Sequence, residues 1–332
     1  MSRILLSHGA GGREMADLIR QVFRGHYAQA DVSQDDSAIV TLGGVNLAFT
    51  TDAFVVSPLF FPGGDIGRLA VAGTVNDLLT AAARPVALAA SFILEEGFPI
   101  PTLERLTDSM QQTAAEAGVS IVTGDTKVVP RGSADQVFIT TTGLGVVLRP
   151  GVSGAAARPR DRVILTGPVG DHGAAVMLAR ENLLQGSPIV SDAAPLNDIV
   201  LALLEAGVEV HALRDPTRGG LAATLNEIAG QSQTAIEIQE GLIPVRPAVA
   251  AVCEALGLDP LTVANEGKMV IIIAPEDADR ALELIRGRRY GQEARIIGEV
   301  LPGPAGRVQV RTVLGTSRLL EMPSGELLPR IC

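Results

Sequence analysis

Residues 137–167 read VFITTTGLGVVLRPGVSGAAARPRDRVILTG, and this stretch decides how the chain is divided. Its first part, Val137 to Val147, is rich in Val, Ile and Thr and predicts a strand. The middle, Arg149 to Gly154, is a Pro/Gly/Ser run without an apolar period, which is typical of a boundary between domains. Asp161 to Gly167 then begins a new strand that runs into a glycine turn. We therefore expect two domains that meet near residue 150.

Apolar periodicity on either side of this boundary indicates the class of fold. In the first half, a short opening strand and a helix from Glu14 are expected, followed by strands at 46–51 and 86–93 and helices at 67–83 and 102–117. The second half predicts helices at 173–181, 196–206, 219–229, 247–256 and 275–286, and strands at 235–238, 269–273 and 295–300. Because some strands alternate and others are continuously apolar, we predict an α+β fold with mixed sheets and not a doubly wound parallel sheet.

These segments group into three parts of the chain. Residues 1–150 form an N-terminal domain and residues 151–305 a C-terminal domain. Residues 306–332 are expected to form a short hairpin followed by a loose tail.

The composition describes a globular, acidic chain. Of its 332 residues, 47% are hydrophobic and 19% charged, which suffices for a large core. The formal net charge of −10 serves solubility and argues against a nucleic-acid groove or an anionic membrane surface. No apolar stretch approaches the roughly 18 residues of a membrane-spanning helix, and the N-terminus lacks the apolar region of a signal peptide. The two cysteines, Cys253 and Cys332, form no disulfide framework, so we expect a cytoplasmic protein.

Aspartates recur at predicted strand ends and helix starts in the first half. They are Asp35, Asp36, Asp52, Asp65, Asp77 and Asp125, with Asp52 and Asp125 following strands that we expect to end at Thr51 and Gly124. Carboxylates that converge from separate elements suit Mg²⁺ bound to nucleotide phosphates. For any single one of them, a helix cap is the simpler interpretation. Asp77 is different, because a carboxylate inside an apolar helix needs a partner if it is buried.

Other polar motifs have two interpretations each. Lys127 is one of two lysines in the chain, and it is either a surface residue or a cation that holds developing phosphoryl charge. The Gly-rich turns at 8–12, 61–65 and 215–220 either bind phosphate through backbone N–H groups or are plain turns. None of them matches the Walker A or Rossmann pattern. Glu266, which precedes Gly267 at the entrance of a strand, is a base, a metal ligand or an exposed turn residue.

The C-terminal cysteine is unusual. Cysteine is usually buried, whereas a chain end is difficult to bury. Cys332 is therefore either an inert thiol or a nucleophile on a swinging arm, provided that its surroundings favour the thiolate. The eight residues from Gly325 extend over roughly 27 Å, enough to enter a site on the same chain or on a neighbour. Cys253 is expected in the core.

Several motifs together resemble a known family over essentially the whole length. They are HGAGG at 8–12, DDSA at 35–38, TDAFVVSP at 51–58, GTVNDL at 73–78, GDTK at 124–127, RDPTRGG at 214–220, NEG at 265–267 and the ending PRIC at 329–332. The chain resembles the HypE family of hydrogenase maturation factors, in the superfamily of aminoimidazole ribonucleotide synthetase and selenophosphate synthetase. The ending is the most specific motif, because the sister enzymes lack it.

The resemblance implies a fold, an activity and partners. The N-terminal domain pairs with its twin in a homodimer, and the C-terminal domain covers ATP. Cys332 receives a carbamoyl group from a HypF-like carbamoyltransferase, and ATP-dependent dehydration converts it into a thiocyanate. The cyanide then passes to iron held by a HypC/HypD-like complex, for the [NiFe]-hydrogenase active site.

The residues fit this chemistry, because dehydration of an amide needs a phosphorylated oxygen as leaving group and a base for the nitrogen protons. Our hypothesis is that Asp36, Asp52, Asp77 and Asp125 hold Mg²⁺ and the phosphates, while Lys127 stabilises the transferred phosphoryl group. Glu266 is the candidate base or substrate-orienting residue. Gly11, Gly12, Asp215 and Gly219 complete the expected nucleotide contacts.

Two rival functions stay open at this point. A sister enzyme that phosphorylates a free small molecule would not need Cys332. A non-enzymatic scaffold whose tail is a docking peptide would not bind nucleotide, and the aspartates and Gly-rich turns speak against it.

Overall fold

The computed structural model describes residues 3–24, 26, 34–181, 183, 186–325, 328 and 330–332. The first half comprises a 3-10 turn at Leu6–Gly9, helices α1 (Arg13–Leu18), α3 (Ile66–Thr80) and α4 (Ile100–Ala117), and strands β1 (Ala38–Leu42), β2 (Val45–Phe54), β3 (Phe60–Phe61), β4 (Gly64–Asp65), β5 (Ala83–Glu95), β6 (Ser120–Val129) and β7 (Val137–Val147). The second half comprises helices α5 (Asp171–Arg180), α6 (Asn197–Glu205), α7 (Gly220–Gln231), α8 (Pro247–Leu256) and α9 (Ala278–Arg286), and strands β8 (Arg162–Leu165), β9 (Val210–Arg214), β10 (Ala235–Gln239), β11 (Val270–Ile273), β12 (Arg295–Leu301), β13 (Arg307–Arg311) and β14 (Ser317–Leu319).

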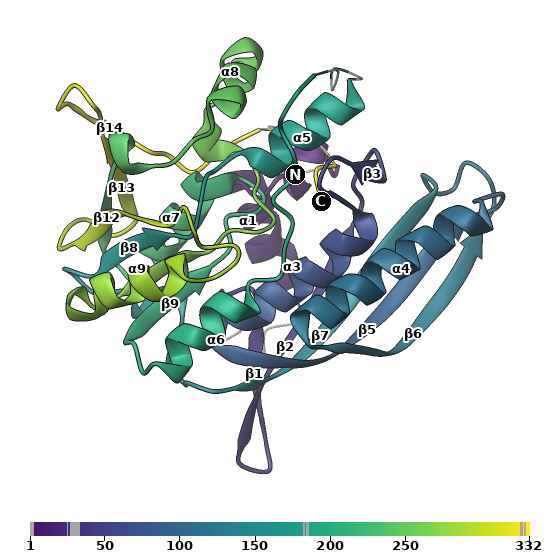
Figure 1. Ribbon diagram of the computed structural model, residues 1–332, viewed down its shortest axis with the longest axis horizontal. Coiled ribbons are helices and arrows are strands. Elements are labelled where there is room, and N and C mark those ends of the chain that lie inside the picture. Colours follow the sequence, from purple (N-terminus) through teal and green to yellow (C-terminus); the bar gives the residue numbers. More distant parts are fainter. Residues whose placement is uncertain are drawn as a thin grey trace.

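Each half contains one large mixed sheet, as predicted. The first sheet has the strand order β1-β2-β7-β5-β6 and is antiparallel except for the parallel pair β5–β6. Helices α3 and α4 lie against one face of it (Figure 1). The second sheet has the order β14-β13-β10-β12-β8-β11-β9. The expected hairpin near the C-terminus is β13–β14, and it extends this second sheet.

Helix α3 is buried on nearly all sides, which explains its Ala/Val/Leu composition. Asp65 caps its N-terminus by accepting hydrogen bonds from the backbone N–H groups of Gly67 and Arg68. The helix packs between the first sheet and the second half, and one cluster of buried apolar side chains includes Val71 and Leu79 of α3 together with Ile271 of β11. The two halves therefore share a core. The site described below lies between the same two halves and includes Asp77 of α3.

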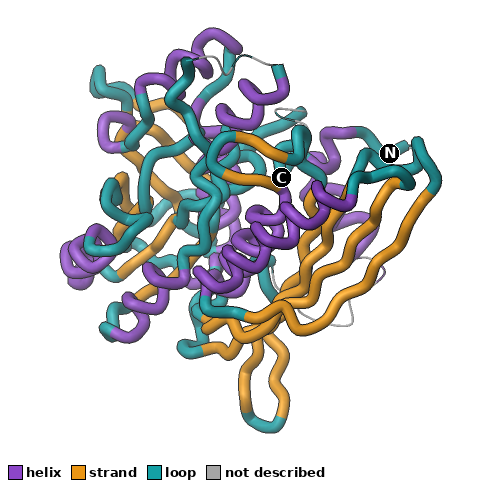
Figure 2. The backbone as a smooth tube through the Cα atoms, turned by 45° about the vertical axis from the view of Figure 1, so that its right-hand side comes forward, coloured by secondary structure: helices purple, strands orange, loops and turns teal. Residues whose placement is uncertain are grey.

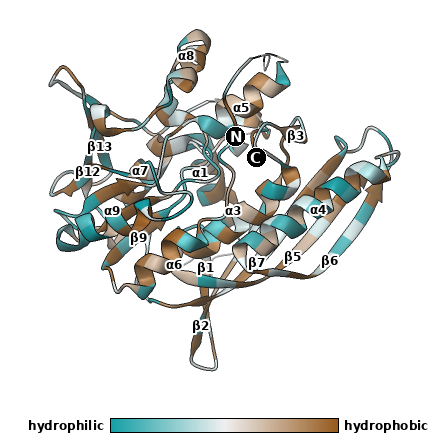
Figure 3. Ribbon diagram, viewed as in Figure 1, coloured by the Kyte–Doolittle hydropathy of each residue, from teal (hydrophilic) through white to brown (hydrophobic). Residues whose placement is uncertain are grey.

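Helices α3 and α4 lie on the same side of the strands of the first sheet (Figure 2), and several strand residues on the other face have exposed apolar side chains. The pairing register places Val40, Leu42, Val45, Phe49, Ile93 and Leu144 on this face, and all six side chains are exposed. We refer to these six residues as the open apolar face. Figure 3 shows the hydrophobic colouring that runs along these strands. No described helix is long and apolar enough to cross a membrane.

Some boundaries differ from the prediction. The opening segment is a 3-10 turn and not a strand. Strand β2 continues through Asp52 to Phe54, and β6 continues through Asp125 to Val129, so neither aspartate follows the end of its strand. Both strands continue because each pairs along its length with a neighbour, β2 with β7 and β6 with β5, and this pairing is a tertiary interaction. Strands β1, β3, β4 and β9 were not predicted.

Candidate active site

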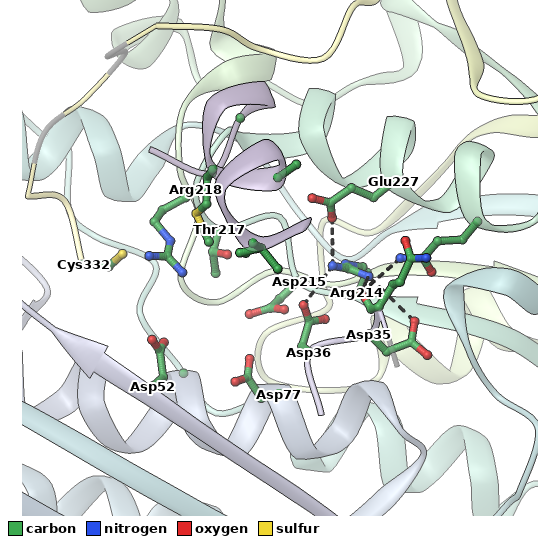
Figure 4. A pocket seen from close by; sticks show the side chains of 18 of the residues that line it. Asp35, Asp36, Asp52, Asp77, Arg214, Asp215, Thr217, Arg218, Glu227 and Cys332 are labelled. Atoms are coloured by element: carbon green, nitrogen blue, oxygen red, sulfur yellow. Dashed lines mark hydrogen bonds and ion pairs between the residues drawn. The ribbon is translucent and has the colours of Figure 1, made fainter. Parts of the chain in front are cut away.

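A cavity of about 520 Å³ opens between the two halves of the chain, and Figure 4 shows its side chains. The predicted residues that line it are Gly11, Gly12, Asp36, Asp52, Asp77, Asp215, Glu266 and Cys332. Eight predicted positions, from seven separate segments of the chain, thus meet at one place. Gly219, Asp125 and Lys127 do not line it.

Carboxylates form one wall of the cavity. Asp77 projects from the interior of α3, and Thr50 Oγ1 lies 2.9 Å from Asp77 Oδ2 and 2.9 Å from the backbone oxygen of Asp36. The partner expected for a carboxylate within an apolar helix is therefore present. The side chain of Asp52 lies on the α3 side of β2, since Asp52 pairs with the buried Thr141 of β7.

Crowding of these acids changes their protonation. Burial, followed by the charges of Asp215, Asp36 and Asp52, raises the pKa of Asp77 well above its usual range. Burial and the Asp36 charge raise the pKa of Asp215 to about 8. Burial also raises the pKa of Asp36, and its Oδ2 atom has no hydrogen-bond partner among the described residues. Such an arrangement accommodates a cation, which would relieve the mutual repulsion.

Arg214, at the end of β9, is the largest omission from the predicted site. Its guanidinium lies 3.2 Å from Asp36 Oδ1, 3.8 Å from Asp35 Oδ1 and 2.8 Å from Glu227 Oε2. It holds the Asp35–Asp36 turn against the second half, while Asp35 Oδ1 also accepts from the backbone N–H of Gly154. The sequence signal was the RDPTRGG motif, in which Arg214 and Arg218 flank Asp215 and Thr217.

Two Gly-rich turns pack on each other beside the cavity. A Cβ atom on Gly11 would lie 2.4 Å from Arg218 Cβ, and one on Gly219 would lie 2.8 Å from the backbone oxygen of Gly11. A Cβ atom on Gly12 would lie 2.4 Å from the backbone oxygen of Pro323. The glycines thus allow three backbone segments to approach closely: the Gly11–Gly12 turn, the turn at Arg218–Gly219 and the segment at Pro323. Gly219 does not line the cavity itself but packs against Gly11, which does.

The end of the chain is bound inside this site and is not loose. The backbone N–H groups of Val55 and Ser57 donate to the carbonyl oxygens of Cys332 (3.0 Å) and Arg330 (3.3 Å). His172 Nε2 lies 2.7 Å from the carbonyl oxygen of Ile331, and an Arg180 N–H donates to that of Arg330 at 2.8 Å. Pro329, Glu326 and Leu327 lie outside the described residues.

The surroundings of Cys332 do not favour the thiolate. Burial, followed by the negative charge of Glu266, raises the pKa of the Cys332 thiol, and the nearby Arg218 guanidinium offsets this only in part. Our condition for a reactive nucleophile is therefore not met in this position of the tail. Cys253 is buried in α8, as predicted.

Glu266 is not an exposed turn residue. It is 3% exposed, and its Oε1 atom has no hydrogen-bond partner among the described residues. Burial and the charges of Asp215, Asp192 and Asp52 raise the pKa of the Glu266 carboxyl well above its usual range. A buried carboxyl with a raised pKa that shares a cavity with a terminal thiol has the properties of a general base.

Asp125 and Lys127 lie elsewhere, on the exposed edge strand β6. They form an ion pair at 2.5 Å, and both side chains are more than half exposed. The register pairs Lys127 with Ile93 and Asp125 with Ser91, so both point away from α3, on the side of the open apolar face. The single chain therefore does not bring them to the cavity. Among the described residues, no group of three or more His, Cys, Asp or Glu side chains has the geometry of a preformed metal site.

Comparison with known proteins agrees with this geometry. Residues 34–147 match the model of the AIR synthase related protein N-terminal domain, and residues 158–311 match that of the C-terminal domain. The chain is 53% identical to carbamoyl dehydratase HypE of Cupriavidus necator, over 99% of this chain and 95% of that protein. This chain belongs to the HypE family of AIR synthase related proteins.

Solved structures of the HypE family share the fold. The structure of hydrogenase maturation protein HypE in complex with ATP has a TM-score of 0.85 and 48% identity, covering 99% of this chain and all of that one. A HypE–HypF complex has a TM-score of 0.87 and 47% identity, covering 92% of this chain and 99% of that one. Both the two-domain mixed α/β fold and the family predicted from the motifs are confirmed.

Proposed function

We propose that this protein is an ATP-dependent carbamoyl dehydratase that converts a carbamoyl group on Cys332 into a thiocyanate. The observation that carries the proposal is that Cys332 and Glu266 line the same cavity as the carboxylates Asp36, Asp52 and Asp77. A thiol-bound substrate, a base and a phosphate-binding wall are thus adjacent. The similar proteins named carbamoyl dehydratase and the ATP complex of a HypE protein support the same activity.

The reaction balances with these groups. The carbamoyl oxygen attacks the γ-phosphorus of ATP, so that an O–P bond forms and ADP leaves. The C–O bond then breaks with departure of phosphate, and the two protons on nitrogen are lost in turn, leaving S–C≡N. Glu266 is suited to accept a nitrogen proton because its pKa is raised and its Oε1 atom is unpartnered. Arg218 carries positive charge close to Cys332 and the acids.

Magnesium fits the acidic wall. Asp36, Asp52 and Asp77 are the residues of this chain that would hold it, in keeping with the unpartnered Asp36 Oδ2 and the raised pKa of Asp77. Mg²⁺ takes only a few carboxylates and completes its shell with phosphate oxygens and water, so a closed protein cage is not required. When bound, the ion would neutralise phosphate charge.

A homodimer gives a role to Asp125 and Lys127. The open apolar face gathers six exposed apolar side chains on one side of the first sheet, and such a surface suits a second copy of the same sheet. Because Asp125 and Lys127 lie among its apolar side chains, such a dimer would direct this ion pair towards the second copy. We propose that Lys127 and Asp125 act on the phosphates across the dimer.

The partners follow from the position of Cys332. Its thiol lines the cavity and its backbone is held by Val55, so we propose that the tail leaves this position for loading by a carbamoyltransferase and returns to it for dehydration. We propose a HypF-like enzyme as the donor, in line with the solved HypE–HypF complex, and a HypC/HypD-like iron complex as the acceptor of cyanide. The cytoplasmic location remains a prediction.

Intact-mass spectrometry tests the proposal. The wild type and Cys332→Ala are incubated with a carbamoyl-donor system and then with Mg-ATP. We expect the wild type to gain a carbamoyl group and then lose the mass of one water, and the variant to show neither change. ATP hydrolysis without any adduct would support the free-substrate enzyme instead, and absence of ATP binding would support the scaffold.

A further inference from the structure

Residues 191–194 form a short segment that holds Glu266 from both sides. Asp192 Oδ1 accepts a hydrogen bond from the backbone N–H of Glu266 at 3.0 Å. The backbone N–H of Ala194 donates to the carbonyl oxygen of Glu266 at 3.3 Å. The backbone position of the candidate base is therefore set by this segment and not only by β11, which begins four residues later at Val270.

A buried ion pair fixes the segment in place. Lys268 Nζ lies 2.9 Å from Asp192 Oδ2 and donates to the carbonyl oxygen of Gly267 at 3.1 Å. The two side chains are 9% and 4% exposed. A Cβ atom on Gly267 would lie 1.8 Å from the backbone oxygen of Asp192, so the two segments are in direct backbone contact. A buried pair is costly to desolvate and adds little net stability, which favours a functional reason for it.

The same segment also holds the tail. Ser191 Oγ lies 2.8 Å from His172 Nδ1, and His172 Nε2 lies 2.7 Å from the carbonyl oxygen of Ile331, the residue before Cys332. The backbone N–H of Ser191 donates to the carbonyl oxygen of Pro62 at 2.7 Å. Two consecutive residues, Ser191 and Asp192, thus connect the thiol-bearing tail with the base.

We propose that Asp192 and Lys268 are positioning residues, which set the Glu266 carboxylate at the correct place relative to the group carried by Cys332. This inference rests on the proposed dehydration and names the residues that organise its base. The charge of Asp192 also contributes to the raised pKa of Glu266, after burial and Asp215. On their far side, Asp192 and Lys268 line a second cavity of about 1050 Å³ together with Asp171 and Arg246.

Paired substitutions test the proposal without leaving a single buried charge. In D192N/K268M the asparagine oxygen can still accept from the Glu266 N–H, whereas D192A/K268M removes this acceptor. Asp171→Asn is the matched control. Asp171 is a buried carboxylate that lines the same second cavity as Asp192 and Lys268. Its Oδ2 atom accepts a hydrogen bond from Arg246 Nε (3.1 Å) and not from the segment that contains Glu266. The readouts are the single-turnover rate of water loss from the carbamoylated protein, the KM for ATP and the melting temperature.

We expect D192A/K268M to dehydrate about 100-fold more slowly, the size of effect that a misplaced catalytic group produces, with KM for ATP and melting temperature near wild type. D192N/K268M should recover most of the rate, and Asp171→Asn should match the wild type. An unchanged rate in D192A/K268M would overturn the positioning role. So would a parallel loss of rate, ATP binding and thermal stability, which indicates a purely structural pair. If wild type itself loses no water, the proposed function fails first.

Discussion

The carbonyl oxygen of Cys332 accepts a hydrogen bond from the backbone N–H of Val55 at 3.0 Å. Val55 directly follows β2, the strand that carries Asp52 into the acidic wall. The end of the chain is therefore attached to an element of the proposed phosphate-binding site, and this bond orients the residue that carries the thiol. In the proposed function, loading and dehydration require the tail to exchange between this bound position and an external one.

Weakening the bound position should expose the thiol. Arg180 donates to the carbonyl oxygens of both Ser57 and Arg330, so Arg180→Met removes a bridge between the tail and the segment after β2. Each such bond contributes about 1 kcal/mol, and we expect iodoacetamide to alkylate Cys332 roughly 5- to 10-fold faster. Site-resolved mass spectrometry measures the rate, with the buried Cys253 as internal reference.

Arg84→Met, which removes an exposed ion pair to Glu205, is the control and should leave the rate unchanged. An unchanged rate in Arg180→Met would show that Arg180 does not restrain the tail.

Asp215 should make the nucleotide-free protein less stable as the pH rises. Its folded pKa of about 8 lies above the unfolded value, so its neutral form is favoured by folding. The stability that it contributes is complete below pH 4 and is lost as the pH rises through about 8. Asp215→Asn removes this loss, and its advantage over wild type in urea unfolding should grow by at least about 1 kcal/mol between pH 5 and pH 8.5. Saturating Mg²⁺ should reduce the difference. A difference that does not depend on pH would exclude the ionised Asp215 as its cause.

The sequence predicts most of this fold because its strands and helices have clear apolar periods. Strand β9 escapes prediction because its buried residues include His211 and Arg214, whose polar groups are satisfied by partners distant in sequence. His211 Nδ1 lies 2.7 Å from Asp161 Oδ2, and only the folded chain shows this pairing. The cavity residues were found from motifs, whereas the role of Arg214 depends on three carboxylates that meet only in the folded chain. The position of Asp125 and Lys127 depends on strand pairing, which local patterns do not specify.

Charging the open apolar face should separate the subunits. Phe49 and Leu144 are directly opposite each other on β2 and β7, and both are exposed in the single chain. Phe49→Asp places a carboxylate within this face, and we expect light scattering to report a monomer of half the wild-type mass. If Asp125 and Lys127 act across the dimer, ATP-dependent water loss should fall at least about 100-fold in the same variant. Leu256→Asp is the control, since Leu256 is 52% exposed and ends α8, a helix that stands apart from the first sheet (Figure 1). A fully active monomer would exclude the cross-subunit role.

Gly11 and Gly9 offer a matched test of the close approach between the two Gly-rich turns. Gly11 has a φ of +76°, and its Cβ atom would lie 2.4 Å from Arg218 Cβ, whereas a Cβ atom on Gly9 would meet nothing within 4 Å. Gly11→Ala must therefore displace Arg218, which lies beside Cys332 and Glu266 in the cavity. We expect this variant to lose about 2 kcal/mol of stability and to bind ATP at least 10-fold more weakly, as measured by urea unfolding and calorimetry. Gly9→Ala should match the wild type in both measurements. If the two variants behave alike, the turn tolerates a side chain at Gly11, and the close contact with Arg218 is not needed for stability or ATP binding.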